Sequence, residues 1–188
     1  MTNAARSVSR AGTGLRRLGL LALVLVSALA VTGCTKSEAQ LSSEALQRGV
    51  EAHNAGSLQE AQDNYEQALR HDPANVMAIF NLGLVASQLG DPREAENRYR
   101  MALSTDPDYA PALWNLALLR IDAGSLPEVV DLLQRYVLVR PNEASAHLRL
   151  SQVLAQLGRT EEAAVALARA AELDPSVVAP PVAGSPAP

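Results

Sequence analysis

A 34-residue period runs through most of this 188-residue chain and limits its fold more than any other feature. Two independent markers keep that period. Prolines that follow Asp or Arg close successive units at Pro73, Pro107, Pro141 and Pro175. Glycines keep the same step in the middle of each unit, at Gly56, Gly90, Gly124 and Gly158. Internal repeats of this length indicate a stack of small units, each of which buries its apolar face against its neighbours.

Each unit is predicted to form two antiparallel helices. In the second unit, apolar residues recur at helical spacing from Ala78, and Gly90 allows the chain to reverse. Asp91 is expected to cap the second helix with Pro92 in its first turn, and Pro107 ends it. Ser57 and Ser125 are expected to cap other units in the same way. The predicted units are 42–75, 76–109, 110–143 and 144–177.

Residue size alternates between the two helices of each unit. A column of small residues falls in the first helices, at Gly49, Gly83, Ala117 and Ser151. A column of large residues falls in the second helices, at Tyr65, Tyr99, Leu133 and Leu167. Small side chains facing large ones at a fixed step are typical of interlocking helix pairs.

These residues resemble the tetratricopeptide repeat. The stretch 79–83, the series Ala95, Tyr99 and Ala102, and the pair 106–107 follow the consensus of that family. The resemblance implies an all-α, right-handed solenoid of four helix pairs; the alternative is an unrelated helical bundle. Repeat three departs most, because Val129 and Tyr136 stand where the family usually has alanine.

The first 33 residues are predicted to be a secretory signal. Four arginines precede an apolar run at 18–31, which is short for a bilayer span but ordinary for a signal. The run leads into 31–34, which resembles the bacterial lipobox, with Cys34 as its cysteine. That resemblance implies lipidation of Cys34, cleavage before it and attachment to a membrane; the alternative is an uncleaved hydrophobic anchor. Two or three acyl chains hold a protein durably, whereas one does not.

The lipobox resemblance also implies a location. Thr35 rather than Asp follows the cysteine, which favours the periplasmic face of the outer membrane in a two-membrane bacterium, or the outer leaflet of the cell membrane otherwise. Residues 34–41 are then a tether. Residues 178–188 are rich in Pro and Ala and are predicted to be a disordered tail.

Composition excludes several classes of function. Residues 34–188 hold 12 Lys and Arg against 20 Asp and Glu, which disfavours binding to nucleic acid. One cysteine excludes an internal disulfide and a zinc site built from cysteines. His53, His71 and His147 fall in three different repeat columns, so no metal site is expected. No catalytic set or phosphate loop stands out, and neither an enzyme nor a cofactor is expected.

The family resemblance implies a binding groove along the first helix of each pair. Its predicted residues are Gln47, Phe80, Asn81, Leu84, Trp114, Asn115, Leu118 and Arg149. Asn81 and Asn115 are expected to hold peptide units of an extended ligand by paired hydrogen bonds, with Phe80 and Trp114 as apolar contacts. With Arg149 as its only base, the groove is expected to take an apolar or neutral protein segment.

Together these features predict a lipid-anchored adaptor of the bacterial envelope that binds another protein. The combination resembles tetratricopeptide lipoproteins that assist the assembly or localisation of pilus and secretion complexes, such as pilotins and Flp-pilus assembly lipoproteins. The alternative is a scaffold or regulator of a cell-wall enzyme complex.

Overall fold

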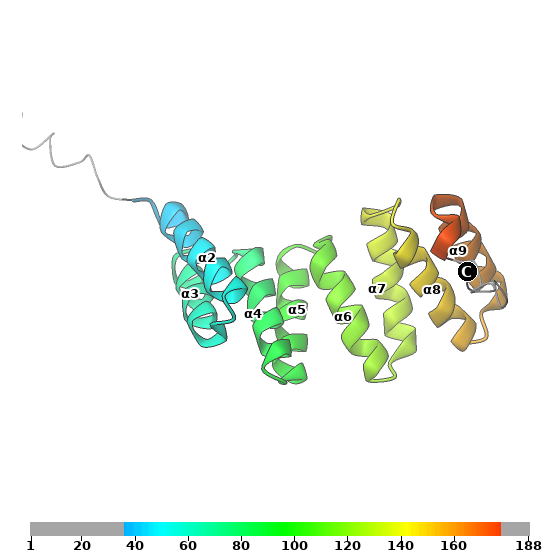
Figure 1. Ribbon diagram of the computed structural model, residues 1–188, viewed down its shortest axis with the longest axis horizontal. Coiled ribbons are helices and arrows are strands. Elements are labelled where there is room, and N and C mark those ends of the chain that lie inside the picture. Colours follow the sequence, from blue (N-terminus) through cyan, green and yellow to red (C-terminus); the bar gives the residue numbers. More distant parts are fainter. Residues whose placement is uncertain (1–35, 178–188) are drawn as a thin grey trace, which may run out of the picture. The chain divides into compact units, whose positions relative to one another are not determined.

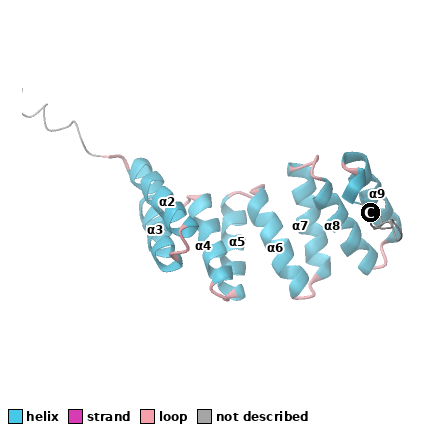
Figure 2. Ribbon diagram, in the orientation of Figure 1, coloured by secondary structure: helices cyan, strands magenta, loops and turns pink. Residues whose placement is uncertain are grey.

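The computed structural model describes residues 36–177. The predicted signal peptide, Cys34 and the tail at 178–188 lie outside these residues. Within 36–177 the chain forms eight α-helices and no strand, and the helices follow one another as pairs (Figures 1 and 2). The pairs are α2 (Glu38–Asn54) with α3 (Leu58–His71), α4 (Val76–Gln88) with α5 (Pro92–Thr105), α6 (Ala110–Asp122) with α7 (Leu126–Val139), and α8 (Ala144–Gln156) with α9 (Thr160–Leu173). A short 3-10 helix, η1 (Pro175–Val177), follows. Among the helices of this part of the chain, none combines the length and the apolar character that crossing a membrane requires.

The predicted all-α fold of stacked helix pairs is confirmed. Helices α4, α6 and α8 begin at residues 76, 110 and 144, the first residues of their predicted units. Helix α2 instead begins at Glu38, so residues 38–41 are helical and not part of a tether, contrary to the prediction. This extra turn contacts the end of α3, where the His71 ring nitrogen lies 2.7 Å from the Glu38 carboxylate.

The turns between paired helices use the glycines that mark the period. Gly90 has a φ of 79°, a left-handed conformation that side chains disfavour. Asp91 then caps α5, since its carboxylate accepts from the Glu94 backbone N–H at 3.0 Å. The same cap was expected at Ser57 and Ser125, but neither side chain caps its helix. The Ser125 hydroxyl instead accepts a hydrogen bond from Arg120.

The size columns explain how the helices of a pair approach closely. A Cβ placed on Gly83 would lie 2.5 Å from Cε1 of Tyr99, so α4 and α5 meet at a distance that only glycine permits. In repeat three the corresponding residues, Ala117 and Leu133, are both fully buried. Leu167, the last large residue of the column, is 41% exposed, because no further helix pair follows α9 in the described residues.

Candidate functional site

The predicted groove residues lie on the first helix of each pair. Gln47 lies on α2, Phe80, Asn81 and Leu84 on α4, Trp114, Asn115 and Leu118 on α6, and Arg149 on α8. The 34-residue step places equivalent side chains at the same point of successive pairs. In solenoids of this kind, repeated helices create an extended concave binding surface. The side chains nevertheless differ in burial and in their hydrogen bonds.

Asn81 and Asn115 are not equivalent. Asn81 is partly exposed, and its amide forms no hydrogen bond to any residue in 36–177. Asn115 is also partly exposed, but its Nδ2 donates to the Pro111 carbonyl at 2.8 Å within α6. Asn81 can therefore offer both of its N–H groups and its oxygen to a ligand, whereas Asn115 uses one N–H within α6 and has its other N–H and its oxygen left.

Phe80 belongs to the core, contrary to the prediction that it contacts a ligand. Only 8% of its surface is exposed. Its ring lies between two tyrosines, with centroids 5.6 Å from Tyr99 and 5.5 Å from Tyr109. Tyr109 is the residue just before α6, and it packs edge-on against Phe80. Phe80 is therefore covered by the end of its own repeat.

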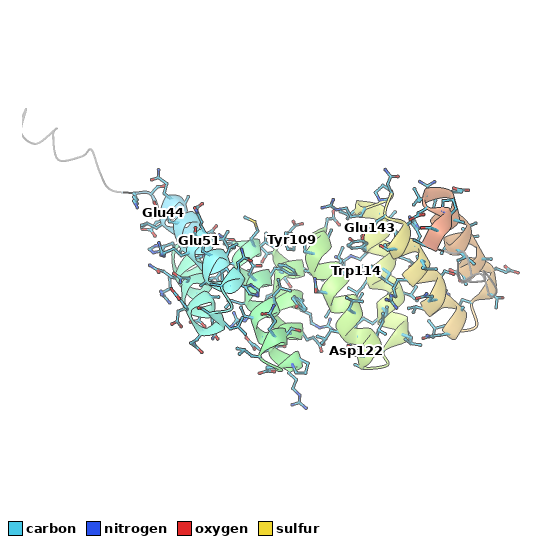
Figure 3. The ribbon with its side chains drawn as sticks, viewed as in Figure 1. Glu44, Glu51, Tyr109, Trp114, Asp122 and Glu143 are labelled. Atoms are coloured by element: carbon cyan, nitrogen blue, oxygen red, sulfur yellow. The ribbon has the colours of Figure 1, made fainter. Side chains whose placement is uncertain are left out.

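Trp114 occupies the same position one repeat later but remains partly exposed. Its ring centroid lies 5.1 Å from that of Tyr136 on α7. The Tyr136 hydroxyl donates to the Glu143 carboxylate at 2.6 Å. Glu143 stands 34 residues after Tyr109, at the end of repeat three. Figure 3 places Trp114 and Glu143 in the same region of the molecule.

The surroundings of Tyr136, which contacts Trp114 and Glu143, raise the pKa of its hydroxyl. Burial raises the pKa of Tyr136 to about 12; the hydrogen bond to Glu143 and the charge of Glu143 act in the same direction, and the charge of Arg140 acts against them. Tyr136 therefore stays a neutral donor at ordinary pH, and its hydroxyl holds the Glu143 carboxylate while its ring packs against Trp114.

The remaining predicted residues are mostly engaged within the protein. Leu84 packs partly buried against the core, and Leu118 is partly exposed. Gln47 donates to Glu51 at 3.0 Å, one turn along α2. Arg149 donates to Gln152 at 3.4 Å on α8. Gln47 and Arg149 are exposed but bonded along their own helices, so the partly exposed groups left for a ligand centre on Asn81, Trp114 and Asn115.

The acidic side chains differ in whether an arginine pairs with them. Arg120 contacts both Glu96 on α5 and Glu128 on α7, at 3.2 and 2.8 Å, and Arg100 contacts the same two acids. The second helices hold further Glu–Arg pairs within α5 and within α9. Glu143, by contrast, forms no ion pair with any Lys or Arg among residues 36–177.

Sequence reasoning missed the residues that decide which aromatic ring is open. Tyr109, Tyr136 and Glu143 were not among the predicted site residues. The available signal was the period itself, because aligning the last residue of each repeat sets Tyr109 against Glu143.

The three histidines are each bonded to a different group. His53 contacts Gln88 at 3.0 Å, His71 contacts Glu38, and His147 contacts the Pro141 carbonyl at 3.0 Å. No group of three His, Cys, Asp or Glu side chains in 36–177 is placed to hold a metal ion.

A second open surface lies away from the predicted groove. A recess of about 460 Å³ between α7, α8 and α9 is lined largely by apolar side chains, including Leu150, Leu154 and Val165. Val165 is 72% exposed. This recess is the main alternative place for a protein partner to dock.

Comparison with known proteins agrees with this architecture. Profiles described as tetratricopeptide repeats match residues 64–97, 86–147 and 130–177, which together run from 64 to 177. No curated protein sequence matches the chain. Repeats of this family are generally non-catalytic scaffolds, and the profiles give no indication of an enzyme family.

Solved structures of similar fold include three repeat proteins. The crystal structure of MamA has 24% identity and a TM-score of 0.60, over 68% of this chain and 74% of that one. YrrB, described as a tetratricopeptide repeat protein with an unusual peptide-binding site, has 22% identity and a TM-score of 0.64, over 70% and 68%. The first tetratricopeptide domain of Spaghetti (RPAP3), bound to an HSP90 peptide, has 22% identity and a TM-score of 0.59, over 64% and 98%. With its helix pairs, its period and these matches, the chain belongs to the tetratricopeptide repeat family.

Proposed function

We propose that this protein is an adaptor that binds an extended segment of another protein along the first helices of its repeats. The open amide of Asn81 carries this proposal. It offers a donor and an acceptor, which suits one peptide unit of an extended chain. Solved repeat domains of similar fold include one bound to a peptide and one described as having a peptide-binding site.

The spacing of the open residues suits such a ligand. Asn81 on α4 and the Asn115 oxygen on α6 stand one repeat apart, and an extended chain advances about 3.3 Å per residue. One extended segment that runs along the first helices can therefore meet both side chains, with Trp114 next to Asn115 in the sequence. The partly exposed indole supplies the apolar contact that a binding face needs.

The binding experiment compares two surfaces. The partner is first captured by crosslinking to the full-length protein in its native cells. The double variant Asn81→Ala/Asn115→Ala is then compared with Val165→Asn, which alters only the recess between α7 and α9. Each lost hydrogen bond is expected to weaken affinity about two- to twelve-fold, and the larger share comes from Asn81. If only Val165→Asn weakens binding, the proposed face is wrong.

We further propose that the adaptor is lipid-anchored at Cys34 and acts in the cell envelope, on the periplasmic face of the outer membrane in a two-membrane bacterium. The lipobox resemblance at 31–34 supports this. The proposed role is to assist assembly or localisation of a pilus or secretion complex, and the alternative is a scaffold for a cell-wall enzyme. Captured secretin or pilus subunits would support the first role, and captured peptidoglycan enzymes the second.

The anchor is tested by Cys34→Ser. This variant is expected to lose lipid labelling and either leave the membrane fraction or accumulate as an uncleaved precursor. Mature wild-type protein without an acyl group on Cys34 would contradict the proposal.

A further inference from the structure

The geometry points to a cation-binding subsite at Trp114: the partly exposed indole and the Glu143 carboxylate take an Arg or Lys side chain of the bound segment. This inference rests on the proposed function, because it names the chemistry of the segment that occupies the same face. It also revises the expectation of an apolar or neutral partner.

The subsite is open because repeat three lacks the aromatic cover of repeat two. In repeat two, Tyr109 packs on Phe80 at 5.5 Å and leaves it 8% exposed. In repeat three, Glu143 stands at the place of Tyr109 and Trp114 at the place of Phe80. A carboxylate covers less of a neighbouring ring than a phenol does, and Trp114 stays partly exposed.

The Glu143 carboxylate is fixed in position and forms no ion pair within 36–177, although Arg140 lines the same recess. One oxygen accepts from the Tyr136 hydroxyl at 2.6 Å, and the other accepts from the Ser145 hydroxyl at 3.3 Å. A carboxylate has about four acceptor positions, so it can bind further donors. Arg140, at the end of α7, is exposed, and neither it nor any other Lys or Arg in 36–177 forms an ion pair with Glu143.

An aromatic face next to an unpaired carboxylate favours a cation. The indole ring attracts a positive charge over its face more strongly than other side chains do. The carboxylate supplies both a charge and hydrogen-bond acceptors, and the flat guanidinium of Arg can stack on the ring while it donates to the carboxylate. By contrast, Arg100 and Arg120 already neutralise Glu96 and Glu128, so those acids are poorly suited to a ligand.

The experiment uses the fact that Trp114 is the only tryptophan of the full chain, so its fluorescence reports on this subsite alone. Purified full-length protein is titrated with a capped ten-residue peptide that carries one central Arg and no other charged group. A second peptide has norleucine in place of that Arg. We expect a saturable fluorescence change, with the Arg peptide binding about tenfold more tightly than the norleucine peptide. That advantage should shrink as salt is added.

Two variants test whether Glu143 is the acid that binds the Arg side chain of the peptide. Glu143→Gln is expected to remove the advantage of the Arg peptide, while Glu51→Gln, which alters an exposed acid on α2, should keep it. Equal binding of both peptides to the wild type would overturn the cation subsite and leave the peptide-binding function intact. An unchanged preference in Glu143→Gln, or no response to either peptide, would also overturn it. The proposed function is judged separately, by whether Asn81→Ala/Asn115→Ala loses the captured partner.

Discussion

Phe80 and Trp114 occupy the same position in successive repeats, yet one is core and the other is surface. Both rings pack at a tilt against a tyrosine of the second helix, with centroids 5.6 Å apart for Phe80 with Tyr99 and 5.1 Å apart for Trp114 with Tyr136. The difference lies in the last residue of the repeat, which is Tyr109 in one case and Glu143 in the other. One residue at a repeat boundary thus decides whether an aromatic ring stabilises the fold or is open to a partner.

This tyrosine also differs in its place on the second helix. Tyr99 belongs to the size column and fills the space left by Gly83. In repeat three that column holds Leu133, and the aromatic ring is supplied by Tyr136, three residues further along α7. Three residues are nearly one helical turn, so the ring keeps its face of the helix and moves toward Glu143. The unusual tyrosine of repeat three is therefore part of the open site.

The largest expected effect is on stability. Phe80→Ala should reduce the free energy of unfolding by about 3–5 kcal/mol, because it leaves a cavity among buried rings. Trp114→Ala should cost about half as much, since its ring is already partly in water. Urea denaturation followed by circular dichroism measures both. Equal losses would mean that the two rings are packed alike and would break the comparison.

The second prediction concerns the close approach of α4 and α5. Gly83→Ala places a methyl group 2.5 Å from a Tyr99 ring carbon, and overpacking of this kind costs about 1–3 kcal/mol. The better helix propensity of alanine offsets about 1 kcal/mol of that. The net change in unfolding free energy is therefore a loss of up to about 2 kcal/mol in the same denaturation experiment.

A matched double variant sharpens this test. Gly83→Ala combined with Tyr99→Leu recreates the Ala117 and Leu133 pair of repeat three. The Cβ contact is then relieved, so adding Gly83→Ala to Tyr99→Leu should cost less than adding it to the wild type. An equal cost in both backgrounds would show that the tyrosine ring is not the obstacle.

The sequence predicts the fold more completely than the site. The period specifies where α4, α6 and α8 begin, because Gly and Pro act locally on the backbone. The early start of α2 was missed, since that turn comes with a contact between Glu38 and His71, 33 residues apart. The serine caps were wrong for a similar reason at Ser125, whose hydroxyl is engaged by the Arg120 side chain.

The sequence predicts where the site residues stand along the helices, but not how deeply each one is buried. Helical spacing places Phe80 and Trp114 in one column, and it contains no information on what covers each ring. That depends on packing between residues about 30 positions apart, such as Phe80 with Tyr109. Side-chain hydrogen bonds within a helix are also hard to predict. Asn115 donates to the Pro111 carbonyl one turn earlier in α6, whereas Asn81 makes no equivalent bond in α4.

The third prediction exchanges Tyr109 and Glu143, the residues that end repeats two and three. Glu143→Tyr should shield Trp114, so acrylamide should quench its fluorescence less than in the wild type. The new ring contact stabilises by about 0.5–1.5 kcal/mol, and the lost hydrogen bond to Tyr136 costs a similar amount. Stability should therefore change little. The matched control, Tyr109→Glu, should leave Trp114 quenching unchanged and lower stability by uncovering Phe80. Unchanged quenching in Glu143→Tyr would mean that Glu143 does not control access to Trp114.

The smallest expected effect is on titration of Tyr99 and Tyr136. The pKa of each is raised to about 12, for Tyr99 by burial against the opposing effect of Ser87, and for Tyr136 by burial together with Glu143. A raised pKa favours the neutral phenol in the folded state. Each tyrosine therefore contributes stability that is fully present below about pH 10 and is lost as pH rises through about 12.

Glu143→Gln is expected to make the pKa values of Tyr99 and Tyr136 differ. The change removes the charge of Glu143 but not the burial, so the pKa of Tyr136 should fall part of the way toward its ordinary value. Tyr99 should keep its pKa and serve as an internal reference. Phenolate absorbance measured against pH follows both groups, and Tyr136→Phe identifies which step belongs to Tyr136. If Glu143→Gln leaves that step in place, the charge of Glu143 does not contribute to the raised pKa of Tyr136.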